Sequence, residues 1–472
     1  MLQNRYFTFI NVIGLSISFI SFLFIYAYVS YEISYDDFHP QRDQLYRIIN
    51  YDQSTGYKGR PTSTPLARTL SQHWSDEATF ARFGQDPVYL EATDNKYYEE
   101  NFYWSDPEIF TLFHLPFLYG DVQTALSAPN SIVITAEKSE KYFGLGVNPV
   151  GKMIPIKVYD SDTDLLMRVD GVLELLPENT DLPFEILGSM ANALDLYSRF
   201  NDSWGFLWLH TYALVPQKAD LARIEASIPA IMEEARGDRW NANRDGYEFQ
   251  PMSKVHLYST DVKASLTSGN INYVITFVII GIFILLIATI NYLNLMGARV
   301  NKRAGEVGVR KVMGASKRQL MAQFLTESNL IIFISLFLAL MITVMAFPLL
   351  VDFIGKPLSL GLLFNTKTLL LLLLLGFICG TLSGFYPAVL LSRINSQLGG
   401  SHQRNLSRRN SFQRTLVVLQ FAISVFLIIS TLVIFQQVDF MTNKDLGFND
   451  HRLMTIKLED RKLQDKIRTI ER

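Results

Sequence analysis

The segment Asn291–Glu327 reads NYLNLMGARVNKRAGEVGVRKVMGASKRQLMAQFLTE and joins two long apolar runs, Tyr273–Leu295 and Leu330–Leu350. Before its final residue, the segment sets one acid, Glu306, against many basic residues: Arg299, Lys302, Arg303, Arg310, Lys311, Lys317 and Arg318. Short basic loops between membrane spans lie in the cytoplasm under the positive-inside rule. The sequence therefore predicts two membrane helices joined on the cytoplasmic side.

Helical spacing gives this basic loop two faces. The apolar face holds Val309, Val312 and Met313, and the polar face holds Arg303, Glu306 and Arg310. Gly314 is expected to end the helix, and Ser316 with Gln319 forms a capping box that begins the next one. Two hypotheses fit this pattern: a helix that docks on a cytosolic partner, or a basic loop that is merely solvated.

The composition limits the possible classes of protein. The chain has 472 residues, of which 49% are hydrophobic, and a formal net charge of -2, so its overall charge says little about partners. The single cysteine, Cys379, cannot form an intrachain disulfide or a multi-cysteine metal site. Apolar residues collect in runs long enough to cross a bilayer, which needs about 20 residues.

The apolar runs predict five spans and the segments between them. The first run is longer than the apolar core of a signal peptide, roughly 7–15 residues, so we expect a retained span and a cytoplasmic N-terminus. A large acidic segment follows it, and the basic loops place that segment outside the cytoplasm. The expected ranges are spans at 6–29, 273–296, 321–350, 368–391 and 415–437, an extracytoplasmic domain at 31–270, a cytoplasmic coupling loop at 297–320, a flexible cytoplasmic linker at 392–414 and the start of a second extracytoplasmic domain at 438–472.

Helix and strand patterns mix within residues 31–270, which predicts an α+β domain. Helices are expected at Thr64–Trp74 and Leu221–Arg236, and strands at Ser131–Ile134, Met153–Val158, Met167–Leu173, Leu207–Val215 and Glu248–Tyr258. His256 is expected in the last strand, facing solvent or a polar partner. The pairs Asp36-Asp37 and Glu99-Glu100 are interpreted as solvated.

Small residues recur at helical spacing in two of the expected spans. They indicate close helix packing, which for the fourth span is expected against a helix of this chain or of a partner. The residues concerned are Gly14 and Ser18 in the first span and Gly376, Gly380 and Gly384 in the fourth.

No catalytic or metal-binding pattern emerges from the sequence. The segment Gly146–Lys152 approaches a phosphate loop, but Met153 replaces the hydroxyl that would hold magnesium and Pro149 removes a backbone donor. The histidines lack metal-ligand spacing. The centres of the expected spans lack the ionisable residues of an ion-coupled carrier. We expect neither an enzyme nor a nucleic-acid-binding protein.

The run Arg303–Ser316, R-x-x-E-V-G-V-R-K-V-M-G-A-S, together with Gln323–Ser328 resembles the permease subunits of the FtsX/MacB-like group of ABC transporters. Three strings between Ser131 and Pro177 resemble the MacB-like periplasmic core domain. The resemblance implies a multi-pass α-helical protein of the bacterial inner membrane, with its large α+β domain inserted between the first and second spans. It also implies that the basic loop is a coupling helix for a cytosolic ATPase dimer, with these contact residues: Arg303, Glu306, Val309, Arg310, Val312, Met313 and Gly314.

By the same resemblance, ATP and magnesium belong to the ATPase partner, and this chain needs no cofactor of its own. Further candidate partners are the lipid bilayer, a periplasmic adaptor, and a second permease copy or a second half of this chain. Leu446-Gly447-Phe448 and Arg452–Ile456 resemble the strings at Phe38 and Leu45–Ile48, so we expect a two-repeat permease with an incomplete second half.

We expect a permease that passes force from the ATPase to the extracytoplasmic domain. The sequence does not choose among export of drugs or peptides, lipoprotein release and control of a cell-wall hydrolase. The alternative is a membrane receptor with an extracytoplasmic sensory domain.

Overall fold

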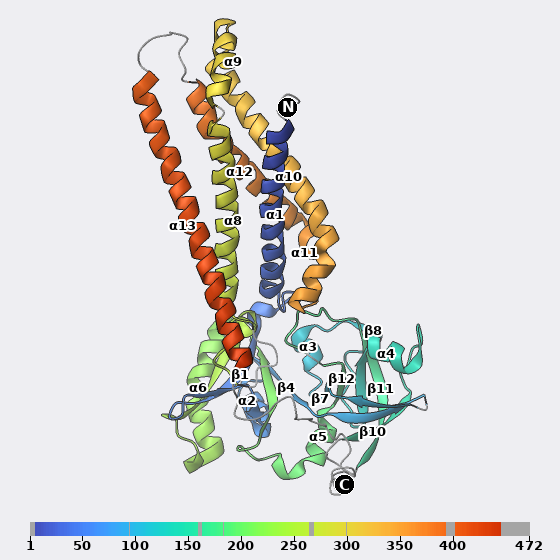
Figure 1. Ribbon diagram of the computed structural model, residues 1–472. Coiled ribbons are helices and arrows are strands. Elements are labelled where there is room, and N and C mark those ends of the chain that lie inside the picture. Colours follow the sequence, from blue (N-terminus) through green and yellow to red (C-terminus); the bar gives the residue numbers. More distant parts are fainter. Residues whose placement is uncertain are drawn as a thin grey trace. The chain divides into compact units, whose positions relative to one another are not determined.

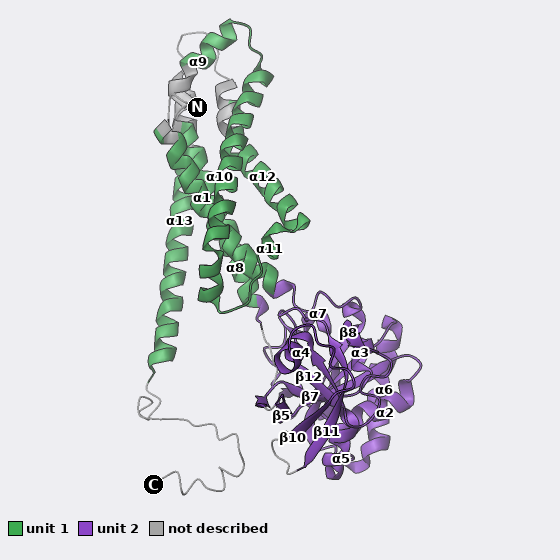
Figure 2. Ribbon diagram, turned by 90° about the vertical axis from the view of Figure 1, so that its right-hand side faces the viewer, with its two compact units in different colours: residues 1–31, 272–453 green, residues 32–271, 454–472 purple. Residues whose placement is uncertain are grey.

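A computed structural model of the chain describes residues 5–93, 95–158, 163–182, 184–263, 269–298, 300–392 and 402–444. The described residues fall into two compact units, which Figure 2 colours separately. The helical unit contains residues up to Tyr31 and from Asn272 onward, and the sheet unit contains Glu32–Ile271.

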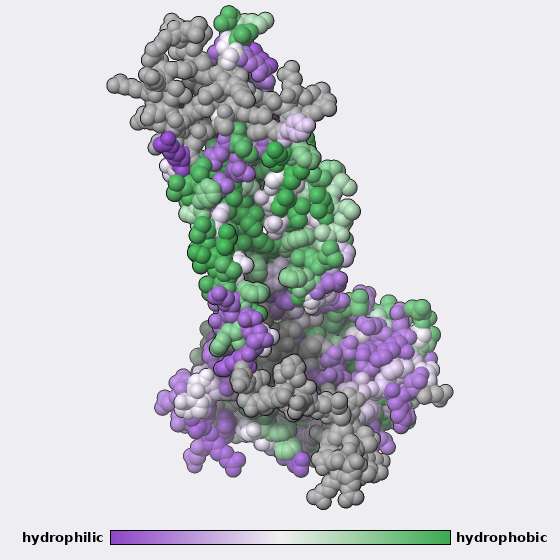
Figure 3. Space-filling view, in the orientation of Figure 1, coloured by the Kyte–Doolittle hydropathy of each residue, from purple (hydrophilic) through white to green (hydrophobic). Residues whose placement is uncertain are grey.

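The helical unit contains five helices that are long and apolar enough to cross a membrane (Figure 1). Apolar side chains cover much of their outer surface, as Figure 3 shows. A helix satisfies its own backbone hydrogen bonds, which the interior of a bilayer requires. The five are α1 (Arg5–Ile33), α8 (Ile271–Ala298), α10 (Lys317–Ile354), α12 (Thr366–Ser392) and α13 (His402–Asn443), with the shorter α9 (Val300–Val312) and α11 (Gly361–Phe364) between them.

Specific contacts join α1 to three other helices of this unit. The Ser16 hydroxyl donates to the carbonyl of Ser335 in α10 at 3.1 Å. The hydroxyls of Tyr26 and Thr368, in α12, lie 2.8 Å apart. The Tyr28 ring meets Phe277 of α8 edge-on, with 5.1 Å between ring centroids. The first span therefore packs inside a bundle instead of standing alone.

The structure describes only part of the flexible cytoplasmic linker expected at 392–414. For residues 402–414, which it describes as helix, the prediction of a flexible segment is wrong. Residues 402–414 continue α13 as regular helix. They contain neither glycine nor proline, so nothing local interrupts the helix that the apolar run begins. Residues 393–401, which include Gly399 and Gly400, lie outside the described residues, as does the part of the expected second domain from 445 to 472.

A single mixed sheet of 14 strands forms the sheet unit. Most neighbours pair antiparallel, while β9 with β11 and β7 with β12 pair parallel. Along the sheet the strands are β14 (Asp245–Pro251), β1 (Leu45–Asp52), β13 (Leu207–Leu214), β4 (Thr79–Gln85), β7 (Phe102–Ser105), β12 (Ile186–Ser189), β9 (Ser131–Thr135), β11 (Asp164–Leu173), β10 (Met153–Val158), β5 (Val88–Ala92) and β6 (Asn95–Glu99), with β2 (Tyr57–Gly59), β3 (Thr62–Ser63) and β8 (Phe117–Gly120) beside β1, β13 and β11.

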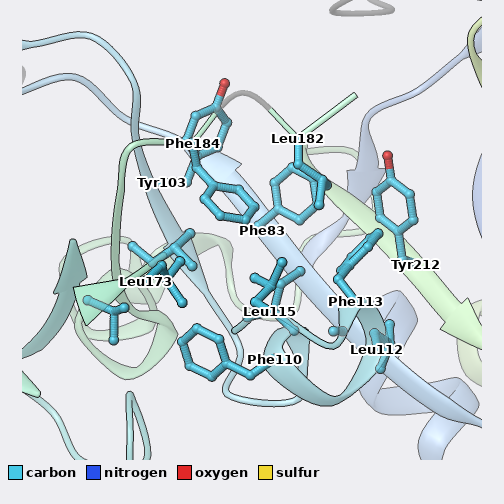
Figure 4. Close-up of a cluster of buried hydrophobic side chains, with 14 of the residues drawn as sticks. Phe83, Tyr103, Phe110, Leu112, Phe113, Leu115, Leu173, Leu182, Phe184 and Tyr212 are labelled. Carbon is cyan, nitrogen blue, oxygen red and sulfur yellow. The ribbon is translucent and has the colours of Figure 1, made fainter. Parts of the chain in front are cut away.

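Helices cover the sheet and close its cores. Leu66 and Leu70 of α2 (Thr64–Trp74) pack with Ile224 and Ile228 of α6 (Lys218–Arg236). A second core, shown in Figure 4, gathers aromatic rings from β4, β7, β13 and α3 (Ile109–Phe113). The remaining helices are α4 (Ala136–Phe143), α5 (Met190–Leu196) and α7 (Met252–Val255). This unit is the predicted α+β domain, and the helix predicted at Thr64–Trp74 is confirmed.

The strand expected at Glu248–Tyr258 is wrong over its second half. Strand β14 ends at Pro251, which has no N–H to continue the ladder, and helix α7 follows at once. His256 is the residue that follows α7, and it is buried. The expected polar partner is present, but it comes from far along the chain.

Candidate functional site

Helix α9 packs against α10 through a buried apolar side chain. Val307 is buried, 2% exposed, and packs in a cluster with Leu320 and Phe324 of α10. Ala315 and Met321 complete this cluster from the turn and the start of α10. The contact fixes which side of α9 faces the rest of the helical unit.

The turn between α9 and α10 has the predicted chemistry. Gly314 adopts φ +96°, a conformation that costs glycine little. The Gln319 backbone N–H donates to the Ser316 hydroxyl at 3.3 Å, and the Ser316 N–H donates to the Gln319 side chain at 2.9 Å. The predicted capping box is therefore confirmed, and it sets the direction in which α10 leaves the turn.

The apolar face of α9 points away from its anchor. Val309, Val312 and Met313 are 61%, 77% and 83% exposed, whereas Val307 is almost completely covered. At about 100° per residue, Val309 and Met313 lie on the side of the helix opposite Val307. Exposed side chains of this kind on an otherwise basic helix are a feature of binding surfaces.

The polar row of α9 is only weakly engaged. Glu306 and Arg310 form an exposed ion pair at 2.7 Å, and Arg310 also donates to the Gln323 side chain at 2.6 Å. An exposed pair four residues apart stabilises a helix by only about 0.3–0.5 kcal/mol. Both side chains can therefore exchange partners at little cost. The side chain of Arg303 lies outside the described residues.

The glycine strip of α12 faces α10 of the same chain. A Cβ on Gly380 would lie 2.7 Å from Cγ and 3.0 Å from Cα of Asn329, and one on Gly384 would lie 2.8 Å from the Ser328 hydroxyl. A Cβ on Gly376 would lie 3.2 Å from the Phe333 ring. The backbones approach so closely that larger residues would not fit.

The small pair of the first span behaves differently. Nothing in the described part of the chain lies within 4 Å of where a Cβ on Gly14 would be. Ser18 donates to the Gly14 carbonyl one turn back at 3.1 Å. The expectation that Gly14 packs closely against a helix is therefore not met by the described helices of this chain.

In the sheet unit, the end of α1 and the segment before α8 meet at one histidine. His256 Nε2 lies 2.9 Å from the Glu32 carboxylate, and its ring stacks on Tyr35 with 3.5 Å between centroids. The Gly269 N–H donates to the His256 carbonyl at 2.9 Å, and the Ile271 N–H donates to the carbonyl of Leu257 at 3.1 Å. We call Glu32, Tyr35, His256 and Gly269 the connector cluster. It ties the outgoing chain, which leaves α1 and enters the sheet unit, to the returning chain, which leaves the sheet unit and enters α8.

A short strap, Asn179–Asp181, clamps the outgoing chain at Ser34 and Asp36. The Asn179 amide donates to the Ser34 carbonyl at 2.8 Å, and the Asp36 N–H donates to the Asn179 carbonyl at 3.0 Å. Asp36 Oδ1 accepts from the Thr180 hydroxyl at 2.7 Å and from the Asp181 N–H at 3.0 Å. The prediction that Asp36 is solvated is wrong, because this carboxyl group is completely buried.

The strap also reaches two buried arginines. The Asp181 carboxylate lies 3.8 Å from Arg47 of β1 and 3.5 Å from Arg60, and it accepts from the Tyr212 hydroxyl at 3.2 Å. Arg47 donates further to the Gln250 side chain at 2.6 Å. All three charged side chains are completely buried. Removing one partner of such a cluster leaves an uncompensated buried charge.

Glu99, the other acid predicted to be solvated, is also buried. It pairs with Lys138 and, at 2.8 Å, with Lys141. Burial alone would raise the pKa of Glu99, but the hydrogen bonds from the two lysines outweigh it and hold that pKa below its usual value. The prediction fails because a pair of adjacent acids does not reveal lysines about 40 residues further on.

The segment Gly146–Lys152 is a turn before β10. The Gly151 N–H donates to the Val169 carbonyl at 2.8 Å, and Lys152 lies over the Phe143 ring at 4.7 Å. A backbone donor and the lysine that a phosphate loop would need are thus already used by the fold. Among the residues that the structure describes, no group of three His, Cys, Asp or Glu side chains could hold a metal ion.

Sequence reasoning missed the strap, the connector cluster and the Val307 anchor. One signal for the strap was available in the sequence. Arg47 interrupts the apolar run Leu45–Ile49, and the structure buries all five residues of this run. A buried arginine requires an acid nearby. The position of that acid, Asp181, could not be found from the sequence.

Comparison with known protein families gives two matches. The model of the MacB-like periplasmic core domain matches residues 8–231, and the model of the FtsX-like permease C-terminal region matches residues 278–396.

Curated relatives with the name Macrolide export ATP-binding/permease protein MacB match part of the chain. The protein from Psychrobacter arcticus is 23% identical over 278 residues, which cover 57% of this chain and 37% of that protein. The protein from Campylobacter jejuni is 27% identical over 173 residues, which cover 36% of this chain and 24% of that protein. The chain thus spans between about a quarter and a little more than a third of the length of these relatives.

Two solved structures that are similar to this chain align over less than half of it. The periplasmic region of MacB from Actinobacillus actinomycetemcomitans aligns with a TM-score of 0.33 and 14% identity, over 45% of this chain and 90% of that one. The extracellular domain of the noncanonic ABC-type transporter YknZ from Gram-positive bacteria aligns with a TM-score of 0.32 and 11% identity, over 44% of this chain and 99% of that one.

Proposed function

Because the chain belongs to the family of FtsX-like permeases with a MacB-like periplasmic core domain, we propose that α9 is the helix on which a separate cytosolic ATPase docks. The observation that carries this proposal is the exposed apolar face of Val309, Val312 and Met313 on a helix whose other side is anchored by Val307. A rigid attachment behind a free apolar face is what force transfer requires.

The apolar face of α9 is the right size for a contact that forms and breaks during the ATPase cycle. Complete burial of one Val or Met side chain contributes about 1.5–3 kcal/mol, and association costs at least several kcal/mol in lost freedom. Three such residues therefore give a modest contact, not a permanent one. Glu306 and Arg310 would then add orientation and a faster encounter more than affinity.

The path from α9 to the outside runs through the helical unit and the connectors. Helix α8 precedes α9 directly in the chain, and it contacts α1 through Tyr28 and Phe277. Both helices continue into segments that the connector cluster ties together at His256. ATP-driven movement of the partner would thus reach the extracytoplasmic domain by two linked connections.

Reconstitution tests the docking. The full chain in lipid nanodiscs would be titrated with a purified candidate ATPase, and the dissociation constant and ATPase stimulation would be measured. Val309→Asp should weaken binding at least tenfold, because a charge cannot be buried without a partner. Glu306→Lys should also weaken it, while Glu306→Gln should have a smaller effect.

A control of matched chemistry lies in the sheet unit. Leu145 is 84% exposed, so Leu145→Asp makes the same kind of change far from α9 in sequence and should leave ATPase binding unchanged. Unchanged affinity in both Val309→Asp and Glu306→Lys would refute the assignment of α9 as the docking helix. A receptor would instead bind no ATPase in any variant.

A further inference from the structure

Among the described residues, two neighbouring buried side chains beside the strap each carry one polar atom without a hydrogen-bond partner. Asp36 and His39 are each about 1% exposed in their side chains, and His39 Nε2 lies 3.8 Å from Asp36 Oδ1. Within the described part of the chain, neither Asp36 Oδ2 nor His39 Nε2 has a hydrogen-bond partner. Buried polar atoms without partners are costly, so such a pair calls for an explanation.

The tautomer of His39 follows from its other nitrogen. Nδ1 lies 3.0 Å from the carbonyl oxygen of Phe113, which can only accept, so Nδ1 carries a hydrogen. In the neutral ring, Nε2 then has only a lone pair to offer. Burial lowers the pKa of His39 to about 4, with smaller effects from the Phe113 carbonyl, His114 and Arg42, so the ring is neutral at physiological pH.

Asp36 is placed where an ionised carboxylate is poorly supported. Burial, and after it the charge of Asp181, raise the pKa of Asp36 to about 7, against hydrogen bonds from Asp181 and Thr180 and the charge of Arg42. The negative charge of an ionised Asp36 favours the charged form of Arg47 and opposes ionisation of Tyr212, so it raises the pKa of both groups. Among the described residues, His39 is the one basic side chain within ion-pairing distance of Asp36, and its ring is neutral.

We propose that Asp36 and His39 form a proton-binding site, in which the buried Asp36 carboxyl carries the proton on Oδ2 and lies beside the neutral ring of His39. A proton on Oδ2 removes the negative charge from a carboxyl group that is buried beside the like charge of Asp181. It also removes a repulsion between a carboxylate and a lone pair. The remaining oxygen, Oδ1, keeps its bonds from Thr180 and Asp181.

The site sits three residues beyond the end of α1, at the strap that clamps the outgoing chain. Loss of the proton puts a buried negative charge beside Asp181, a strap residue. The hydrogen bonds from Thr180 and Asp181 to Oδ1 favour this charge, but burial and the repulsion from Asp181 outweigh them. The fold thereby contains a group whose loss of a proton lowers the stability of this part of the sheet unit as the pH rises. Its importance for transport rests on the proposed function, whereas the proton site itself does not.

Counting protons gives a test that is specific to this pair. Between about pH 4 and pH 6.5, the folded pair holds one proton on Asp36, and the unfolded pair holds one proton on His39. The wild-type pair therefore adds no pH dependence to stability in this range, since both states bind equally many protons. Each single variant should expose the slope of the remaining partner.

The two variants should have slopes of opposite sign relative to wild type. In Asp36→Asn, only the unfolded state binds the histidine proton, so stability falls as the pH drops below about 6.5. In His39→Phe, only the folded state binds the carboxyl proton, so stability falls as the pH rises from about 4 to 7. Each slope approaches a tenfold change in the unfolding constant per pH unit.

Asparagine is also a mimic of the protonated acid. It tolerates the left-handed backbone of Asp36, φ +57°, its carbonyl can accept the same two bonds, and its amide is uncharged at every pH. At pH 8, Asp36→Asn should therefore be at least as stable as wild type. If Asp36 acts as an anion for Arg42 and Arg47, this variant should be less stable at every pH.

The full chain in detergent supplies the readout, because all five tryptophans, at positions 74, 104, 204, 208 and 240, lie in the sheet unit. Urea unfolding followed by tryptophan fluorescence at pH 4.5–8.5 gives the slopes. Infrared spectra of the same samples should show a protonated-carboxyl band at low pH that is lost at high pH and reduced in Asp36→Asn. Parallel slopes in wild type and Asp36→Asn, or a band unchanged by that substitution, would overturn the proposal, whether or not an ATPase binds.

Discussion

Replacing Val307 with alanine should release α9 from α10 while leaving the docking face intact. The side chain is 2% exposed among Leu320 and Phe324, so the substitution removes two packed methyl groups and leaves a small cavity. A loss of this kind costs about 1–2 kcal/mol. That corresponds to roughly a 5- to 30-fold increase in the fraction of molecules with α9 detached.

Val309→Ala is the matched control, since it makes the same change two residues away on the exposed side of the same helix. Alanine favours helix over valine by the same few tenths of a kcal/mol in both variants, so that effect cancels in the comparison. The assay is hydrogen–deuterium exchange of the full chain in nanodiscs, read on the peptide that covers residues 305–316.

The two variants should separate anchoring from docking. Val307→Ala should exchange roughly 5- to 30-fold faster than wild type in this peptide, by the free energy above. Val309→Ala should exchange no faster than wild type but should bind the ATPase more weakly. Equal exchange in both variants would show that Val307 does not hold the helix, and the account of α9 as an anchored helix would fail.

Three further substitutions test other parts of the fold. Gly380→Ala should destabilise the packing of α10 against α12 by about 1–3 kcal/mol in thermal unfolding, whereas Gly14→Ala should have little effect; equal losses would contradict the packing. Asp181→Asn should lower the free energy of unfolding in urea by about 3–5 kcal/mol, because it leaves the buried charges of the arginines without an anion. Asp202→Asn, in an exposed pair, should lower it by less than about 1 kcal/mol. Burial lowers the pKa of His210, so the unfolded state binds its proton first and stability should fall as the pH drops below about 6.5; His210→Gln should reduce this slope, and an unchanged slope would assign it elsewhere.

The sequence predicts the helices and the larger strands because their signals are local. The run of apolar residues in α8 or α10 needs no partner to be recognised as a span. The capping box of Ser316 and Gln319 is likewise complete within four residues, and the structure contains both of its hydrogen bonds. The same holds for α2, where a proline near the helix start and apolar residues at helical spacing define the element.

The buried charges could not be predicted because their partners are distant in sequence. Asp36 and Asp181 are 145 residues apart, and Glu32 and His256 are 224 apart. Two adjacent acids such as Asp36 and Asp37 have the same pattern whether one is buried or both are solvated. In α9, the period of the apolar residues separates Val307 from Val309, but only the packing of α10 shows which of them is the covered side.

The most direct test of the account is the accessibility of a cysteine placed at position 313. Met313 is 83% exposed at the end of α9, and Cys379→Ser removes the native thiol, so Met313→Cys would carry the only reactive group. A membrane-impermeant maleimide should label it in inside-out membrane vesicles but not in intact cells, and added ATPase should protect it. Labelling from outside intact cells, or labelling that the ATPase does not reduce, would contradict the assignment of α9 as the docking helix.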